Sequence, residues 1–143
     1  MSATHVPDAL RERVAAQARH RCGYCLSAEA IMGMSLEIEH TIPESRGGLI
    51  IEENLWLACP PCNARKSDRF IVTDPDTGEL VRLFDPRHQV WSEHFQWNES
   101  CDSIVGVTPT GRATVHALEL NRPVLVNARR LWVEAGWHPL KDS

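Results

Sequence analysis

Residues 22–68 of this 143-residue chain read CGYCLSAEAIMGMSLEIEHTIPESRGGLIIEENLWLACPPCNARKSD. Two cysteine pairs of identical C-x-x-C spacing lie in this segment, Cys22 with Cys25 and Cys59 with Cys62. Such a pair points both sulfurs at one ion, and Zn²⁺ prefers four ligands in a tetrahedron. We therefore expect a four-cysteine zinc site. Four thiolates leave no coordination position for water or substrate, so this zinc is expected to brace the fold and not to catalyse.

The segment between the cysteine pairs has the pattern of two strands separated by a loop. In residues 35–41 apolar and acidic residues alternate, which predicts a half-buried strand with His40 at its end. Residues 43–53 contain Pro43 and the pair Gly47-Gly48 and predict a loop. Residues 55–59 predict a second strand, and the two prolines that follow favour the start of a helix reaching about residue 68.

Four polar residues of this segment suggest a reaction. They are Glu39, His40, Asn54 and Asn63, which supply a carboxylate, an imidazole and two carboxamides. Phosphodiester hydrolysis needs a base that takes a proton from water and a cation that holds the phosphate. Imidazole suits the base, and oxygen ligands suit Mg²⁺ or Mn²⁺.

The order of these elements resembles the HNH endonuclease family. That family carries C-x-x-C, an acidic residue next to His, Pro, Gly-Gly, Asn-Leu, C-x-x-C-Asn and Lys, which read here RCGYC, LEIEHTIPESRGG and ENLWLACPPCNARKSD. The resemblance spans about a third of the chain, residues 21–68. It implies an α+β protein with the ββα-metal fold, in which two strands and a helix clasp one divalent cation.

The resemblance also implies roles for individual residues. His40 is expected to be the general base, with Glu39 and Asn63 as ligands of a catalytic Mg²⁺ or Mn²⁺. Asn54 would tie the loop and hold the orientation of His40. Cleavage would leave 5′-phosphate and 3′-hydroxyl ends. Glu39 stands where Asp is more usual and Asn63 where some members carry His, which leaves the metal preference open.

Each of these residues also has a simpler interpretation. His40 can be a structural histidine, and Asn54 can be only a turn residue. Arg65, Lys66 and Arg46 are candidates for DNA phosphate contacts, but a pair of basic residues on a helix surface is often simply solvated. Cys101 is expected to be an ordinary thiol.

The composition limits the setting of the protein. The formal net charge is −4, which argues against broad electrostatic binding of nucleic acid and favours a local basic patch or a delivery partner. The N-terminal segment lacks a secretory signal, and we find no membrane span, so we expect a cytoplasmic protein. The sequence leaves a homodimer or a delivery partner undetermined.

Outside the cysteine segment we expect an N-terminal helix over residues 7–20 and a C-terminal extension over residues 70–143. The extension would hold hairpins over residues 70–84 and 93–107 and helices over residues 111–120 and 123–135. We expect it to pack on the core, residues 21–69, within a single domain, residues 1–143. Its arginines are interpreted as solvated helix faces, with an extended DNA track as the alternative: Arg112, Arg122, Arg129 and Arg130.

Three functions are compatible with these patterns. The first is a DNA endonuclease or nickase with one catalytic cation that stabilises the leaving 3′-oxygen. The second is a zinc-ribbon module that binds nucleic acid or protein without cutting. The third is a redox protein that uses one C-x-x-C pair, against which the second pair and Glu39-His40 argue.

Overall fold

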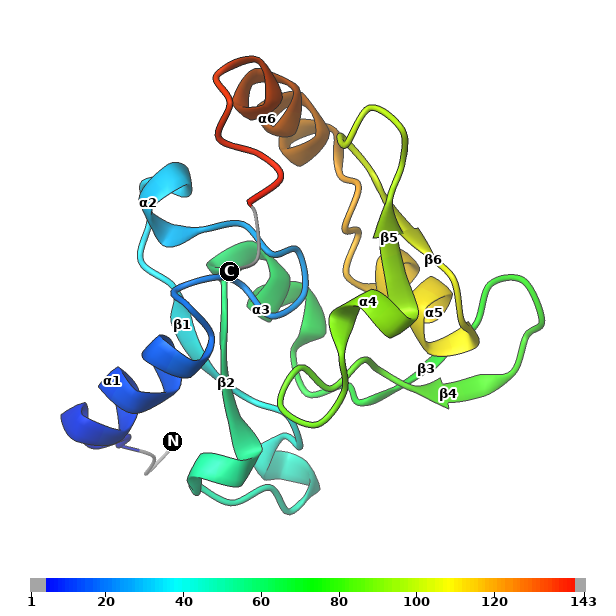
Figure 1. Cartoon of the computed structure of the whole chain (residues 1–143). Helices are drawn as coiled ribbons and strands as arrows, with labels where there is room; N and C mark the ends of the chain where they lie inside the picture. Colours follow the sequence, from blue (N-terminus) through cyan, green and yellow to red (C-terminus); the bar gives the residue numbers. More distant parts are fainter. Residues whose placement is uncertain (1–4, 141–143) are drawn as a thin grey trace. The chain divides into compact units, whose positions relative to one another are not determined.

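A computed structural model describes residues 5–140 of the chain (Figure 1). They form an α+β fold with three two-stranded antiparallel sheets. The chain divides into two compact units, residues 1–70 with 85–89 and residues 71–84 with 90–143. The elements in chain order are α1 (Asp8–Gln17), α2 (Glu29–Met32), β1 (Glu37–His40), η1 (Glu44–Arg46), η2 (Glu52–Asn54), β2 (Leu55–Ala58), α3 (Pro60–Lys66), β3 (Ile71–Thr73), β4 (Leu80–Arg82), α4 (Trp91–His94), β5 (Phe95–Trp97), β6 (Ile104–Gly106), α5 (Pro109–Ala117) and α6 (Pro123–Glu134).

The first unit is built on the β1–β2 hairpin. In its register Glu37 lies opposite Ala58, and His40 lies opposite Leu55. Helix α1 packs against β2, where Val14 and Leu55 are fully buried. An ion pair of 2.8 Å between Arg13 Nε and Glu52 Oε1 also joins α1 to η2. The hairpin is thereby covered by α1.

Helix α3 packs against β1 and brings the C-terminal part of the HNH-like segment to the strand end. Pro60 and Pro61 occupy its first turn, where a missing N–H costs nothing. The helix ends at Lys66, because the next residue, Ser67, has a φ of 52° and does not continue it. The order strand, loop, strand and helix, with His40 at the strand end, is therefore confirmed.

The second unit contains the two remaining hairpins with α4, α5 and α6. Phe84 and Phe95 are buried, and their rings meet edge to face at a centroid distance of 5.1 Å. The buried carboxylate of Asp74 accepts hydrogen bonds from Arg112 Nη2 at 2.8 Å and from Arg112 Nε at 3.2 Å. This pair ties the β3–β4 hairpin to α5.

Three details differ from the sequence expectations. Helices α2 and α4, each of four residues, were not predicted. Glu39 is 1% exposed although the alternating pattern placed it on a solvent face. Arg129 is fully buried, so its assignment to a solvated helix face is wrong: its guanidinium donates to the carbonyls of Asp102 and Leu120.

The other expected elements are confirmed with small shifts of their ends. Both predicted hairpins form, with Asp74–Gly78 and Asn98–Ser103 in their turns. The α+β fold class with a four-cysteine site is confirmed as well. Within residues 5–140 no helix is both long and apolar enough to cross a membrane. The packing of the extension on the core stays a prediction.

Candidate metal centre and active site

The four cysteines expected to bind zinc lie together and are all buried. The sulfur atoms of Cys22, Cys25, Cys59 and Cys62 lie within 4.8 Å of one another. A tetrahedral zinc site with Zn–S bonds of about 2.3 Å has sulfurs about 3.8 Å apart. The Cys25 and Cys59 sulfurs are separated by 3.8 Å, so the cluster has the dimensions of a zinc site. All four thiols are free of disulfide bonds.

The thiols of the cluster differ in their tendency to ionise. Hydrogen bonds from the neighbouring thiol of Cys22 and from Cys59 and Cys62 lower the pKa of Cys25. Burial in turn raises the pKa of Cys22. Ser27 Oγ lies 3.2 Å from Cys25 Sγ and adds to the polar surroundings of that sulfur. The set fits Zn²⁺, which binds cysteines as thiolates.

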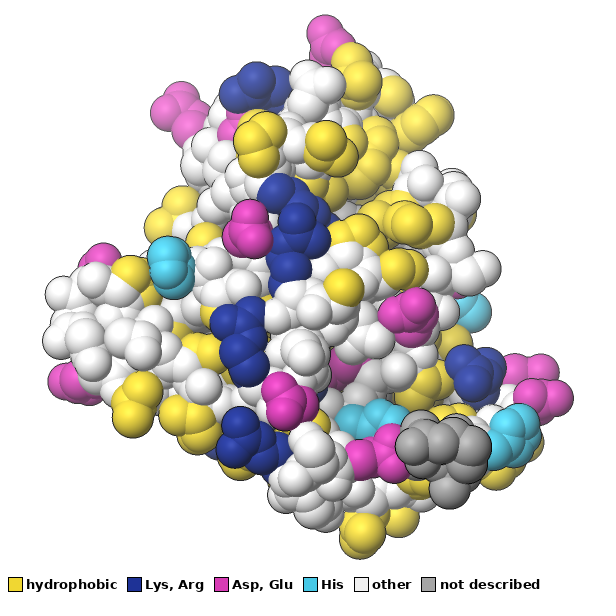
Figure 2. Space-filling view, turned by 180° about the vertical axis from the view of Figure 1, so that it is seen from behind, with side chains coloured by type: hydrophobic (Ala, Val, Ile, Leu, Met, Phe, Trp, Pro, Cys, Tyr) yellow, Lys and Arg dark blue, Asp and Glu magenta, His cyan; other side chains and the backbone are white. Residues whose placement is uncertain are grey.

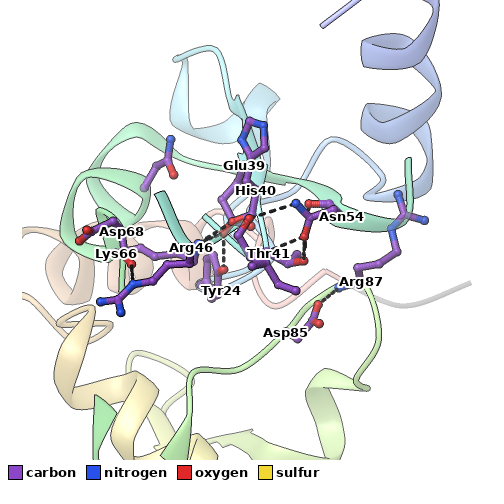
Figure 3. A network of polar contacts seen from close by, with 12 residues as sticks. Tyr24, Glu39, His40, Thr41, Arg46, Asn54, Lys66, Asp68, Asp85 and Arg87 are labelled. Carbon is purple, nitrogen blue, oxygen red and sulfur yellow. Dashed lines mark hydrogen bonds and ion pairs between the residues drawn. The ribbon is translucent and has the colours of Figure 1, made fainter. Parts of the chain in front are cut away.

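Glu39 points into the interior between β1 and α3. Its Oε1 accepts a hydrogen bond of 2.7 Å from the Tyr24 hydroxyl and forms an ion pair of 2.6 Å with Lys66 Nζ (Figure 3). Its Oε2 is buried and has no hydrogen-bond partner among the described residues. A buried carboxylate oxygen without a partner is costly, and a divalent cation would satisfy it.

The proposed base, His40, has a similar feature. Its Nε2 is buried and has no hydrogen-bond partner among residues 5–140. Its backbone carbonyl accepts a hydrogen bond of 2.6 Å from Lys66 Nζ, which fixes the strand end. A nitrogen that makes no bond within the protein remains able to accept a proton from water or substrate.

Asn54 ties together the loop that follows His40. Its Oδ1 accepts hydrogen bonds of 2.8 Å from Thr41 Oγ1 and from the Ile42 N–H. Its Nδ2 donates to the carbonyls of Ile42 at 3.0 Å and Leu49 at 2.9 Å. All four bonds go to the loop, so the side chain acts on His40 only through the backbone.

Two different structural constraints require glycine at positions 47 and 48 of the same loop. Gly47 has a φ of 89°, which side chains rarely permit. A Cβ on Gly48 would lie 1.7 Å from the Ile42 carbonyl oxygen. The loop thus needs glycine at both positions to pass close to residue 42.

Asn63 lies in α3, and its amide is oriented by β1. Its Nδ2 donates a hydrogen bond of 3.0 Å to Glu37 Oε1, which leaves its Oδ1 as the atom available to a cation. A cavity of about 200 Å³ is lined by Glu39, His40, Asn63 and Asp68, among others. The structure therefore brings three of the residues expected to act in catalysis to one hollow.

A second cavity, of about 350 Å³, lies beside the first and shares His40 and Asn63 with it. Its lining also includes His5 and Arg11. Arg11 is exposed on α1, and its guanidinium makes no ion pair or side-chain hydrogen bond with any described residue. No signal in the sequence singles out Arg11, because nothing in α1 shows that the helix lies beside His40.

The three basic residues predicted to contact phosphate are engaged within the protein. Lys66 is 2% exposed, so its placement on a solvated helix surface is wrong. Arg65 donates to the Pro61 carbonyl, while Arg46 donates to the Asp68 carbonyl and lies over the Phe70 ring. On the face in Figure 2, most Lys and Arg side chains have an acidic side chain nearby.

A known protein family matches part of the chain. Residues 22–69 match the model of the HNH endonuclease family. The suspected family is confirmed for this segment, which is therefore an HNH segment and indicates nuclease activity on nucleic acid. No curated protein and no solved structure matches the chain.

Proposed function

We propose that the protein is a metal-dependent endonuclease that hydrolyses DNA phosphodiester bonds. The observation that carries the proposal is a pair of buried atoms at the end of β1, Glu39 Oε2 and His40 Nε2, which have no hydrogen-bond partner in the described part of the chain. Both residues line the same polar cavity as Asn63. A cation ligand and a proton acceptor, side by side in the chain, are what the reaction requires.

In the proposed reaction His40 takes a proton from the attacking water through Nε2. Glu39 Oε2 and Asn63 Oδ1 would hold Mg²⁺ or Mn²⁺, which supplies positive charge for the leaving 3′-oxygen. Asn54 keeps the loop closed and so keeps the backbone after His40 in place. The products would carry 5′-phosphate and 3′-hydroxyl ends.

For substrate binding we propose Arg11 as a phosphate contact, because it lines the cavity that shares His40 and Asn63. Arg46 and Arg65 can assist at the edge of the site, where Arg46 donates to the Asp68 carbonyl and Arg65 to the Pro61 carbonyl. Lys66 acts within the site and does not face a phosphate. The net charge of −4 fits a protein whose DNA affinity is local and modest.

A second candidate function is a zinc module that binds nucleic acid or protein without cutting. The ion pair between Lys66 and Glu39 favours it, because Lys66 already neutralises the carboxylate. Glu39 Oε2 favours the nuclease, since the ion pair with Lys66 is made by Oε1 and leaves Oε2 without a hydrogen-bond partner among residues 5–140.

The test is the cleavage of supercoiled plasmid in Mg²⁺, Mn²⁺ or EDTA. The wild type is compared with His40→Ala at matched zinc content. We expect cation-dependent nicked or linear product from the wild type alone. If a folded, zinc-containing wild type cuts in none of these conditions, the zinc module replaces the nuclease.

A further inference from the structure

The residues around Glu39 hold its two carboxylate oxygens in different states. Oε1 is bound by two donors, Tyr24 Oη at 2.7 Å and Lys66 Nζ at 2.6 Å (Figure 3). Oε2 has no partner among residues 5–140. All three side chains are almost fully buried, so water does not compete for these bonds.

Tyr24 lies in the turn between two cysteines of the four-cysteine cluster. It lies between Cys22 and Cys25, and all three residues are at most 1% exposed. Its hydroxyl donates the hydrogen bond of 2.7 Å to Glu39 Oε1. A side chain between two zinc ligands thus donates to a proposed ligand of the catalytic cation.

Cations differ in how many oxygens they take from a carboxylate. Ca²⁺ accepts six to eight oxygen ligands and often binds both oxygens of one carboxylate, whereas Mg²⁺ demands a near-octahedral set at shorter distances. A glutamate with one oxygen already bound by two donors offers the cation a single oxygen. Such a site loses more affinity for Ca²⁺ than for Mg²⁺ or Mn²⁺.

We propose that Tyr24 and Lys66 are positioning residues that leave Glu39 one oxygen for the catalytic cation and so make the site select small octahedral cations against Ca²⁺. This inference rests on the proposed function, because it takes Glu39 as a cation ligand. It also gives the zinc cluster a role beyond bracing the fold, since the cluster sets the position of Tyr24.

The experiment is a Mn²⁺ titration of the zinc-loaded protein, followed by the paramagnetic signal of free Mn²⁺ and repeated with Ca²⁺ as competitor. The wild type is compared with Tyr24→Phe, which removes only the hydroxyl, and with Lys66→Met, which removes the ammonium group. Ser103→Ala is the control, because it removes a hydroxyl that donates to a carboxylate of the second unit, Asp102, and leaves Tyr24, Lys66 and the cysteines unchanged. Zinc content and far-ultraviolet circular dichroism are measured on every variant.

We expect Tyr24→Phe and Lys66→Met each to shift the ratio of Ca²⁺ to Mn²⁺ affinity about tenfold toward Ca²⁺. The control is expected to keep the ratio of the wild type. Tenfold corresponds to about 1.4 kcal/mol, the scale of one hydrogen bond to a charged group. A folded Lys66→Met protein tests the proposal even if Tyr24→Phe does not fold. An unchanged ratio in folded, zinc-containing variants overturns this proposal alone, provided that the wild type binds Mn²⁺ and cuts DNA. A wild type that binds no Mn²⁺ overturns the proposed function together with this inference.

Discussion

Replacement of Asn54 by Ala tests how the loop after His40 is held. The change removes four hydrogen bonds, two accepted by Oδ1 and two donated by Nδ2, from a side chain that is 7% exposed. Each bond contributes a net 0.5–1.5 kcal/mol or so. We expect the free energy of unfolding to fall by about 3 kcal/mol, because part of the loop can regain water as a partner.

The assay is urea unfolding of the zinc-loaded proteins. The slope of the free energy of unfolding against urea concentration is compared between them, because equal slopes indicate that they share a common unfolded state. Asn54→Asp is the sharper variant, because it keeps the acceptor but sets a carboxylate oxygen against the carbonyls of Ile42 and Leu49. We expect it to be at least as destabilising as Asn54→Ala. Asn127→Ala, on the exposed face of α6, controls for loss of an amide. A loss below about 1 kcal/mol for both Asn54 variants would refute the loop argument.

Three further changes have defined outcomes. Cys59→Ser should lose zinc and unfold residues 22–69, because structural zinc binding supplies much of the folding free energy of small zinc sites. Zinc analysis and amide NMR measure the two effects, and a variant that is folded without zinc would contradict the prediction. Arg112 holds the pKa of Asp74 at about 2, below its usual 3.8, so Asp74 stabilises the fold above about pH 4 and loses this effect as the pH falls toward 2. Asp74→Asn should therefore have a lower Tm than the wild type at pH 7 and a similar Tm near pH 2. If the Tm of the two proteins changes with pH in parallel, the stabilising role of the Asp74–Arg112 ion pair is contradicted. Arg11→Ala, made in the His40→Ala protein, should weaken duplex DNA binding about fivefold and lower the slope of log affinity against log salt concentration by about one. Arg13→Ala, the control, should change neither quantity. Both are measured by fluorescence anisotropy.

The sequence predicted the cysteine cluster and the hairpin–helix order for clear reasons. The C-x-x-C spacing is a local constraint, and the prolines before α3 and the glycines of the loop are local signals as well. These features depend on neighbours in the chain. They could therefore be read before the packing was known.

The surroundings of Glu39 could not be predicted in this way. Its burial depends on Tyr24 and Lys66, which come from a cysteine turn and from α3. Alternation along β1 predicts which residues share a face, but not that a helix covers the acidic face. The donors on Oε1 therefore appear only in three dimensions.

Arg129 shows the same limit in α6. It lies four residues after Leu125, and the structure buries both. Helical periodicity places this position on the buried face of α6, where an apolar residue is favoured. The charge of Arg129 instead suggested that the side chain is exposed. The carbonyls that accept its hydrogen bonds lie outside α6, that of Leu120 just before the helix and that of Asp102 27 residues before Arg129.

The central claim is that His40 is the general base of a nuclease, and chemical rescue tests it most directly. We would measure single-turnover cleavage of a short DNA duplex in Mn²⁺ by the wild type and by His40→Ala, with and without added imidazole. We expect a loss of about 10²–10⁴-fold in the variant, partly restored by imidazole, with zinc content and Mn²⁺ affinity unchanged. Equal rates for the wild type and the variant would contradict the claim.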